Sequence, residues 1–198
     1  MKMNKKVLTI IVVVALAAAS YIGLDFTNIL SDGNTTAQSA PISISDNTIQ
    51  YYFPRGNQPP KPVLIGIINN AKQSLDIAIY SITDTDIVNA IAAAKERGVN
   101  VRLITDANQS AGKYQQAALT ILRNAGITIK INKHAGLMHL KVAIADGQIV
   151  TTGSFNYSQA AEDTNDEVFV VISNAQAAAD FESQFERMWN DTKGFIEF

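Results

Sequence analysis

Hydrophobic and polar residues alternate along this chain in blocks that predict strands and helices in turn. The predicted strands are short and rich in aliphatic residues, and they span 49–53, 74–81, 99–105, 127–132 and 167–173. The predicted helices repeat at helical spacing and span 60–71, 84–97, 111–124 and 175–190. Strands that alternate with helices predict an α/β sandwich with helices on both faces of the sheet.

A further strand is predicted from His139 to Ala145, where every second residue is aliphatic. Residues two apart share one face of a strand, so His139, Lys141, Ala143 and Ala145 are expected on one side. The larger aliphatic residues between them are expected to face a core.

The dipeptide at 146–147 is Asp-Gly, which predicts a two-residue hairpin turn and therefore a mixed sheet. Such a turn would place Ser154 opposite His139 and Thr152 opposite Lys141. Hydroxyl groups and small alanines would then surround an imidazole and an ammonium, as expected for a pocket that binds an anion.

Asp146, Gly153 and Asn156 complete the run H-x-K-x4-D-x6-G-S-x-N over 139–156, and Gly153 would let a ligand approach closely. This run matches the HKD motif of the phospholipase D superfamily residue for residue. The resemblance covers about 51–195 and is greatest to the small bacterial Nuc-type endonucleases. Supporting matches lie at 79–81, 93–99, 153–157 and 188–190. The resemblance implies a phospholipase D-like sandwich with a mixed central sheet.

The residue types of the motif suit the transfer of a phosphoryl group. Neutral imidazole is a nucleophile at physiological pH, so His139 is predicted to attack phosphorus and form a phosphohistidine. Lys141, Asn156 and Ser154 are predicted to stabilise charge on the non-bridging oxygens. Asp146 lies at the turn, a strand's length from His139, and is predicted to be structural.

The resemblance also implies a glutamate downstream of the motif that contacts the nucleophile, and Glu167 matches that position best. Nearby acidic residues fit an ordinary charged loop, namely Glu162, Asp163 and Asp166. A leaving alcohol needs an acid, and His134 is expected to be a loop residue instead. Because the chain carries one motif, the resemblance implies a homodimer whose active site is shared.

The composition restricts the chemistry further. The chain has 0 Cys and 2 His, and neither His stands in a metal-binding spacing. We therefore predict metal-independent chemistry with no cofactor. The net charge of −2 argues against a protein that coats nucleic acid, so phosphate binding must come from a local patch. Candidates are Lys130 and Lys133, for which a solvated strand face is an equal alternative. Further candidates are Lys141, Arg55 and Lys113.

The first residues predict export. Lys2, Lys5 and Lys6 precede an apolar run from Val7 to Ala19, as in a signal peptide cleaved after Ala19. If the run continues to Leu24, it reaches the lower length limit of a membrane anchor. We therefore divide the chain into a signal peptide or anchor at 1–24, a linker at 25–48 and a catalytic domain at 49–198. The domain is expected to be exported to the periplasm or the extracellular space. If residues 1–24 act as an anchor, it would remain tethered to the membrane.

Three functions are compatible with these residues. The first is a phosphodiesterase acting on DNA or RNA, which the small single-motif pattern favours. The second is a phospholipase D that hydrolyses membrane phospholipids by the same chemistry. The third is a catalytically silent phosphate-binding module, against which the intact His139 and Lys141 argue.

Overall fold

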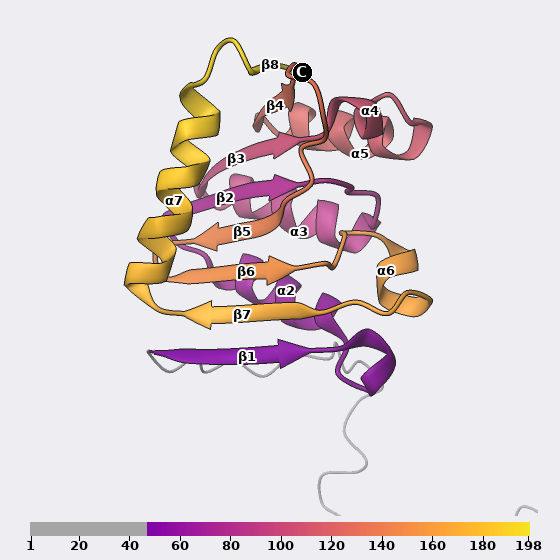
Figure 1. Ribbon diagram of the computed structural model, residues 1–198, viewed down its shortest axis with the longest axis vertical. Coiled ribbons are helices and arrows are strands. Elements are labelled where there is room, and N and C mark those ends of the chain that lie inside the picture. Colours follow the sequence, from indigo (N-terminus) through magenta and orange to yellow (C-terminus); the bar gives the residue numbers. More distant parts are fainter. Residues whose placement is uncertain (1–46) are drawn as a thin grey trace, which may run out of the picture. The chain divides into compact units, whose positions relative to one another are not determined.

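One mixed sheet with the strand order β1-β7-β6-β5-β2-β3-β4-β8 organises the computed structural model, which describes residues 47–198 (Figure 1). Its strands are β1 (Thr48–Tyr52), β2 (Ser74–Ile79), β3 (Asn100–Thr105), β4 (Thr128–Asn132), β5 (Lys141–Ala145), β6 (Ile149–Gly153), β7 (Phe169–Ser173) and β8 (Phe195–Glu197). The pairs β2–β3 and β3–β4 are parallel, and the other neighbouring pairs are antiparallel. The predicted mixed sheet is confirmed.

Helices cover both faces of this sheet, as predicted (Figure 1). The long helices are α2 (Pro60–Asn70), α3 (Thr85–Glu96), α5 (Lys113–Asn124) and α7 (Ala175–Asn190). Shorter ones are the 3-10 helix η1 (Pro54–Gly56), α4 (Ala107–Ser110) and α6 (Gln159–Asp163). Asp84 begins α3 because its carboxylate accepts hydrogen bonds from the N–H groups of Asp86 and Ile87.

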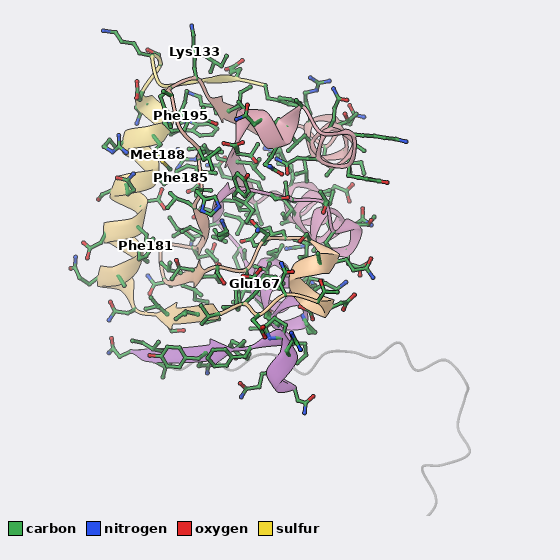
Figure 2. The ribbon with its side chains drawn as sticks, turned by 45° about the vertical axis from the view of Figure 1, so that its right-hand side comes forward. Lys133, Glu167, Phe181, Phe185, Met188 and Phe195 are labelled. Carbon is green, nitrogen blue, oxygen red and sulfur yellow. The ribbon has the colours of Figure 1, made fainter. Side chains whose placement is uncertain are left out.

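The two faces of the sheet have separate hydrophobic cores. Helices α2, α3 and α5 bury one core that includes Leu75, Leu103 and Ala143. Helix α7 buries the other, and Phe185 and Met188 point from it toward the sheet (Figure 2). Successive residues of the central strands therefore contribute to opposite cores, which explains why these strands are mostly aliphatic.

Strand β5 differs from its prediction at its start and on one face. It begins at Lys141, and Leu140 is 38% exposed instead of facing a core. Ala143 and Ala145 are buried beneath the helices, so they form part of a core and not the floor of a pocket.

The hairpin after β5 has the predicted turn but a different register. Asp146 and Gly147 have φ values of 53° and 62°, as a type I′ turn requires. The ladder pairs Ala145 with Ile149, however, so Gln148 is an additional residue of the connection. Its carbonyl accepts the N–H of Asn174 at 3.0 Å instead of joining the ladder. A shift of one residue exchanges the faces of a strand. The predicted pairing of Ser154 with His139 and of Thr152 with Lys141 is therefore wrong.

The remaining differences are small elements. The predicted helix at 111–124 begins at Lys113, and the short α4 precedes it. Strand β8 was not predicted. The predictions of a signal peptide or anchor and of most of the linker fall on residues 1–46, outside the described residues. Within residues 47–198, no helix is long and apolar enough to cross a membrane.

Candidate active site

The residues of the motif gather at one end of the sheet, except for Asp146. Strands β2 and β3 end there, and β5 begins there, because β5 runs antiparallel to β2. The carboxyl ends of parallel strands are where ligands bind in open α/β sheets. Tyr80, Asp106, His139 and Ser154 each flank a strand at this end.

His139 and Lys141 form the centre of the site. The His139 side chain lies in an exposed segment, whereas Lys141 is only 7% exposed. Lys141 Nζ lies 3.2 Å from both ring nitrogens of His139 and 3.0 Å from its carbonyl oxygen. Burial lowers the pKa of Lys141, and the negative charge of Glu167 opposes this effect. The ammonium is thus partly desolvated, and no carboxylate of the described residues forms an ion pair with it.

Tyr80 forms an aromatic wall beside both residues. Its ring centroid is 4.5 Å from that of His139, and Lys141 Nζ lies 4.8 Å from the same centroid. Gln109 Nε2 donates to the Tyr80 hydroxyl at 2.9 Å, which fixes the ring from α4. Sequence reasoning assigned Tyr80 no role. Its position directly after a buried parallel strand was the signal that could have found it.

Asp106 connects α4 to the segment that carries His139. The carboxylate is fully buried, and one oxygen accepts the N–H of Gln109 at 3.0 Å. The other oxygen accepts the N–H of Met138, the residue before His139, at 3.0 Å. One buried carboxylate therefore holds both the helix that orients Tyr80 and the backbone beside His139. This residue, too, directly follows a parallel strand, and sequence reasoning missed it.

Ser154 and Glu167 form a bonded pair. The Ser154 hydroxyl donates to one carboxylate oxygen of Glu167 and accepts the N–H of Val168 at 3.1 Å. Asn165 Nδ2 donates to the other carboxylate oxygen at 3.0 Å. The hydroxyl proton of Ser154 is thus engaged with Glu167. No hydrogen bond between Glu167 and His139 is present in the described chain, and Glu167 acts on Lys141 through its charge.

The side-chain amide of Asn156 is not fully hydrogen-bonded within the described residues. Its Oδ1 atom is buried and has no hydrogen-bond partner in the described part of the chain. A buried polar atom without a partner is costly, and such atoms often mark functional positions. This oxygen can accept a hydrogen bond from a bound donor, whereas only the Nδ2 group of the same amide could donate to a phosphate oxygen.

Asp146 lies at the far end of β5 and is structural, as its position at the turn predicts. Its carboxylate accepts hydrogen bonds from the N–H groups of Lys72, Gln73 and Ser74. Burial raises the pKa of Asp146, but these donors and the Lys72 charge outweigh burial and leave the pKa below its ordinary value. This carboxylate anchors the start of β2 to the hairpin.

Gly153 serves strand packing, which corrects the expectation that it admits a ligand. Its φ is +128°, and a Cβ atom there would lie 2.1 Å from the carbonyl oxygen of Val168. The space beside Gly153 is therefore filled by the backbone that leads into β7. The close approach lets Ser154 reach Glu167.

The predicted cationic patch is not assembled as a unit. Lys130 Nζ donates to the Trp189 carbonyl at 2.6 Å and lies over the Trp189 ring, so its charge is engaged. Lys133 is exposed and lies far from Glu167 in Figure 2. Arg55 pairs with Asp166 at 3.3 Å on the surface.

The other candidates lie elsewhere. Glu162 accepts the N–H of Lys61, and Asp163 and Lys113 are exposed. His134 bonds to the Ala135 carbonyl and packs against Phe195, consistent with a loop role. Within residues 47–198, no cluster of three or more His, Cys, Asp or Glu side chains could hold a metal ion.

The sequence of this chain is similar to a known family profile and to several characterised proteins. Residues 64–189 match the family profile described as "Cardiolipin synthase, PLD-like domain". The mitochondrial cardiolipin hydrolase of Chlamydomonas reinhardtii is 35% identical over 123 residues, which cover 62% of this chain and 54% of that protein. A phospholipase D of Rickettsia conorii is 34% identical over 114 residues, or 58% of this chain and 56% of that protein. The chain thus spans about half the length of these relatives.

Solved structures match over more of their length. Nuc from Salmonella typhimurium, a phospholipase D family member, has a TM-score of 0.71 and 32% identity, covering 77% of this chain and 99% of that one. NucT from Helicobacter pylori has a TM-score of 0.68 and 26% identity, covering 77% of this chain and all of that one (100%). The sheet and the helices on its two faces are shared with these proteins.

Proposed function

The chain belongs to the phospholipase D superfamily, and from this premise we propose that it hydrolyses phosphodiesters of DNA or RNA through a phosphohistidine intermediate. One observation carries this proposal. The exposed imidazole of His139 lies against the buried ammonium of Lys141, at the end of the sheet where ligands bind. A nucleophile that solvent can reach, beside an ammonium without an ion-pair partner, is suited to an anionic substrate.

The proposed reaction has two displacements. In the first, a ring nitrogen of His139 attacks phosphorus, an N–P bond forms, and the P–O bond to the leaving alcohol breaks. An acid gives its proton to the departing oxygen. In the second, water attacks phosphorus, the N–P bond breaks, and a base accepts the proton of water. Lys141 and Asn156 stabilise the charge on the non-bridging oxygens in both steps.

Ser154 and Glu167 have a supporting role in this proposal. Because the Ser154 hydroxyl donates to Glu167, it holds that carboxylate near Lys141. Ser154 also remains an oxygen-binding candidate, since its proton can turn to a substrate oxygen once phosphate is bound. We propose that Glu167 orients a histidine nucleophile when the site is fully assembled.

We further propose that the assembled site contains two chains. The acid for the leaving group is a second histidine, and His134 is held by Ala135 and Phe195 instead. A homodimer with an isologous interface would bring the His139 of the partner subunit to the same phosphate. The two imidazoles would then need opposite protonation states, which gives a bell-shaped pH profile.

The share of each relative's length that this chain matches supports nucleic acid over lipid as the substrate. The chain matches nearly all of Nuc and all of NucT, but about half of the cardiolipin hydrolases. The rival substrate, membrane phospholipid, draws support from the names of those relatives and from the apolar segment at 7–24. We propose export through residues 1–24, which cell fractionation of the tagged protein would test.

The substrate experiment uses the purified protein with plasmid DNA, RNA and phosphatidylcholine vesicles in excess EDTA. We expect cleavage of nucleic acid and none by the His139→Ala variant. Cleavage of vesicles alone would assign the lipid reaction. A requirement for added Mg²⁺ or Zn²⁺ would contradict the metal-independent mechanism. Binding of substrate without turnover would support the silent phosphate-binding module.

Subunit mixing tests the shared site. Wild-type protein is refolded with His139→Ala protein at varied ratios, and activity is measured against the wild-type fraction. Sites that need both chains give activity proportional to the square of that fraction. A linear dependence, or a monomer with full activity on dilution, would reject the shared site.

A further inference from the structure

A groove of about 550 Å³ leads away from His139 along α7. The segment before β5 forms one wall, and Arg187 and Met188 of α7 form the other. Phe195 closes the end near the start of β8, and Figure 2 shows Met188 and Phe195 at the same end of the molecule. The volume lies in the range of pockets that bind small ligands. Because His139 lines the groove, any occupant lies next to the scissile phosphate.

The floor and the rim of this groove differ in chemistry. Met138, Met188 and Phe195 are at least 95% buried and provide apolar surface at the floor. His134 packs edge-on against Phe195, with ring centroids 5.2 Å apart. The rim carries the polar side chains of Gln184, Arg187 and Asp191 and the exposed side chains of Leu137 and Leu140. This mixture of apolar surface with polar and charged groups suits a nucleotide, which presents a flat apolar base together with a polar sugar and phosphate.

Arg187 is an exposed cation of the rim. A hydrogen bond from the N–H of Gly194 and, to a smaller extent, the charge of Arg187 lower the pKa of Asp191 on the same rim, but the two side chains form no ion pair. Arg187 Nε donates to Gln184 Oε1 at 3.0 Å, and no carboxylate within residues 47–198 forms an ion pair with this guanidinium. By contrast, Arg102 beneath the same helix is held by Asp76, Glu182 and Glu186. The exposed guanidinium of Arg187 therefore retains donors for an oxyanion, and arginine binds phosphate through two parallel hydrogen bonds.

We infer that this groove binds the nucleotide adjacent to the scissile phosphate. Its base lies on the apolar floor, and Arg187 binds the neighbouring phosphate. Successive phosphates of a nucleic-acid strand are one nucleotide apart. A groove that is lined by His139 and has an arginine without an ion pair on its wall therefore offers groups that match two successive phosphates. The inference rests on the proposed function, because it assumes that His139 attacks a polynucleotide.

The test is a double-mutant cycle on binding, with the His139→Ala protein so that turnover plays no part. The probe is a fluorescently labelled oligonucleotide, with either natural linkages or one uncharged methylphosphonate. The methylphosphonate is placed in turn on the 5′ and the 3′ side of the central phosphate. We expect one of the two placements to weaken binding about tenfold. With Arg187→Ala added, the same placement should have no further effect.

Arg123→Ala is the matched control, because it removes one exposed arginine from α5, away from the groove. It should keep the full methylphosphonate effect, and Arg187→Lys should keep part of it. The slope of log Kd against log salt should also fall by about one for Arg187→Ala alone. Additive penalties at both placements would overturn the inference, as would absence of oligonucleotide binding. The inference fails in these binding data, whereas the proposed function fails in the turnover assay.

Discussion

The motif residues at the two ends of β5 differ in how far the protein satisfies their polar side chains. At one end, Asp146 accepts hydrogen bonds from three successive backbone N–H groups. At the other end, Lys141 is buried without an ion-pair partner in the described residues, and the Oδ1 atom of Asn156 has no partner there. The Asp146 carboxylate is therefore engaged by the backbone of the fold, whereas the Lys141 ammonium bonds to His139 and carries a charge that no carboxylate of residues 47–198 pairs with. The motif thus combines one residue that the fold engages with residues that we propose act on the substrate.

Replacing His139 is expected to have the largest effect. His139→Ala should lower kcat by at least about 10⁴-fold, because the nucleophile is lost. Its side chain is exposed but contacts Tyr80 and Lys141, so the free energy of unfolding should change by no more than about 1 kcal/mol. Single-turnover assays and thermal unfolding measure the two quantities. An activity within tenfold of wild type would remove His139 from the mechanism.

Lys141→Met is expected to have the second largest effect. We expect kcat to fall about 10²- to 10³-fold, because one source of charge stabilisation is removed. KM should change less, since the effect belongs to the transition state. Burial disfavours the ammonium, so the melting temperature should stay the same or rise. A clear drop in melting temperature would mean that Lys141 is also a structural anchor.

Asp146→Ala should show the opposite pattern. Loss of the acceptor for three backbone N–H groups should lower the free energy of unfolding by about 2 kcal/mol. The kcat of the folded protein should remain within about threefold of wild type, measured well below the melting temperature. Asp146→Asn is the matched control, because it keeps one oxygen acceptor. If Asp146→Ala were stable but inactive, the division between the two ends of β5 would be wrong.

The contribution of Asp146 to stability should depend on pH. The folded-state pKa of Asp146 lies below its ordinary value of 3.8, so its stabilising contribution is present above that pH. The contribution is lost as the pH falls through the lower folded-state pKa. The difference in unfolding free energy between wild type and Asp146→Ala should therefore shrink below about pH 4. A difference that persists unchanged to pH 2 would contradict the role of the ionised carboxylate.

Tyr80 should have the smallest effect of this series when only its hydroxyl is removed. Tyr80→Phe loses the hydrogen bond from Gln109 but keeps the ring beside His139 and Lys141. We expect kcat to fall about threefold and Tyr80→Leu to lower it at least about tenfold, since the aromatic wall is then lost. The pH profile of kcat should shift in Tyr80→Leu and stay in place in Tyr80→Phe. Equal profiles in both variants would assign Tyr80 to packing alone.

Regular elements and the motif could be predicted from the sequence because their signals are local. Helix α7 follows its periodic pattern over Ala175–Asn190, and Asp146-Gly147 forms the expected turn. The register of the hairpin could not be predicted, because the carbonyl of Gln148 bonds to Asn174, a residue distant in sequence that follows the neighbouring strand β7. Only the fold shows which partners compete for one carbonyl.

The same limit applies to the site. His139 and Lys141 are adjacent in the structure because they are two residues apart in the chain. Tyr80 and Asp106 reach the site from other strands, so no spacing in the sequence points to them. The buried carboxylate of Asp106 holds the segment before His139 through one backbone N–H, a contact that a residue pattern does not encode.

Gly153 has a consequence for how this protein could be inactivated or controlled by design. A single added methyl group at this position would collide with the Val168 carbonyl. The chain leading into β7 would have to move, and Ser154 and Glu167 would separate although neither had been altered. Gly153→Ala would therefore yield a protein that retains each proposed catalytic side chain but misplaces a pair of them. Such a variant would separate the presence of these side chains from their arrangement, which substitution of the side chains themselves cannot do.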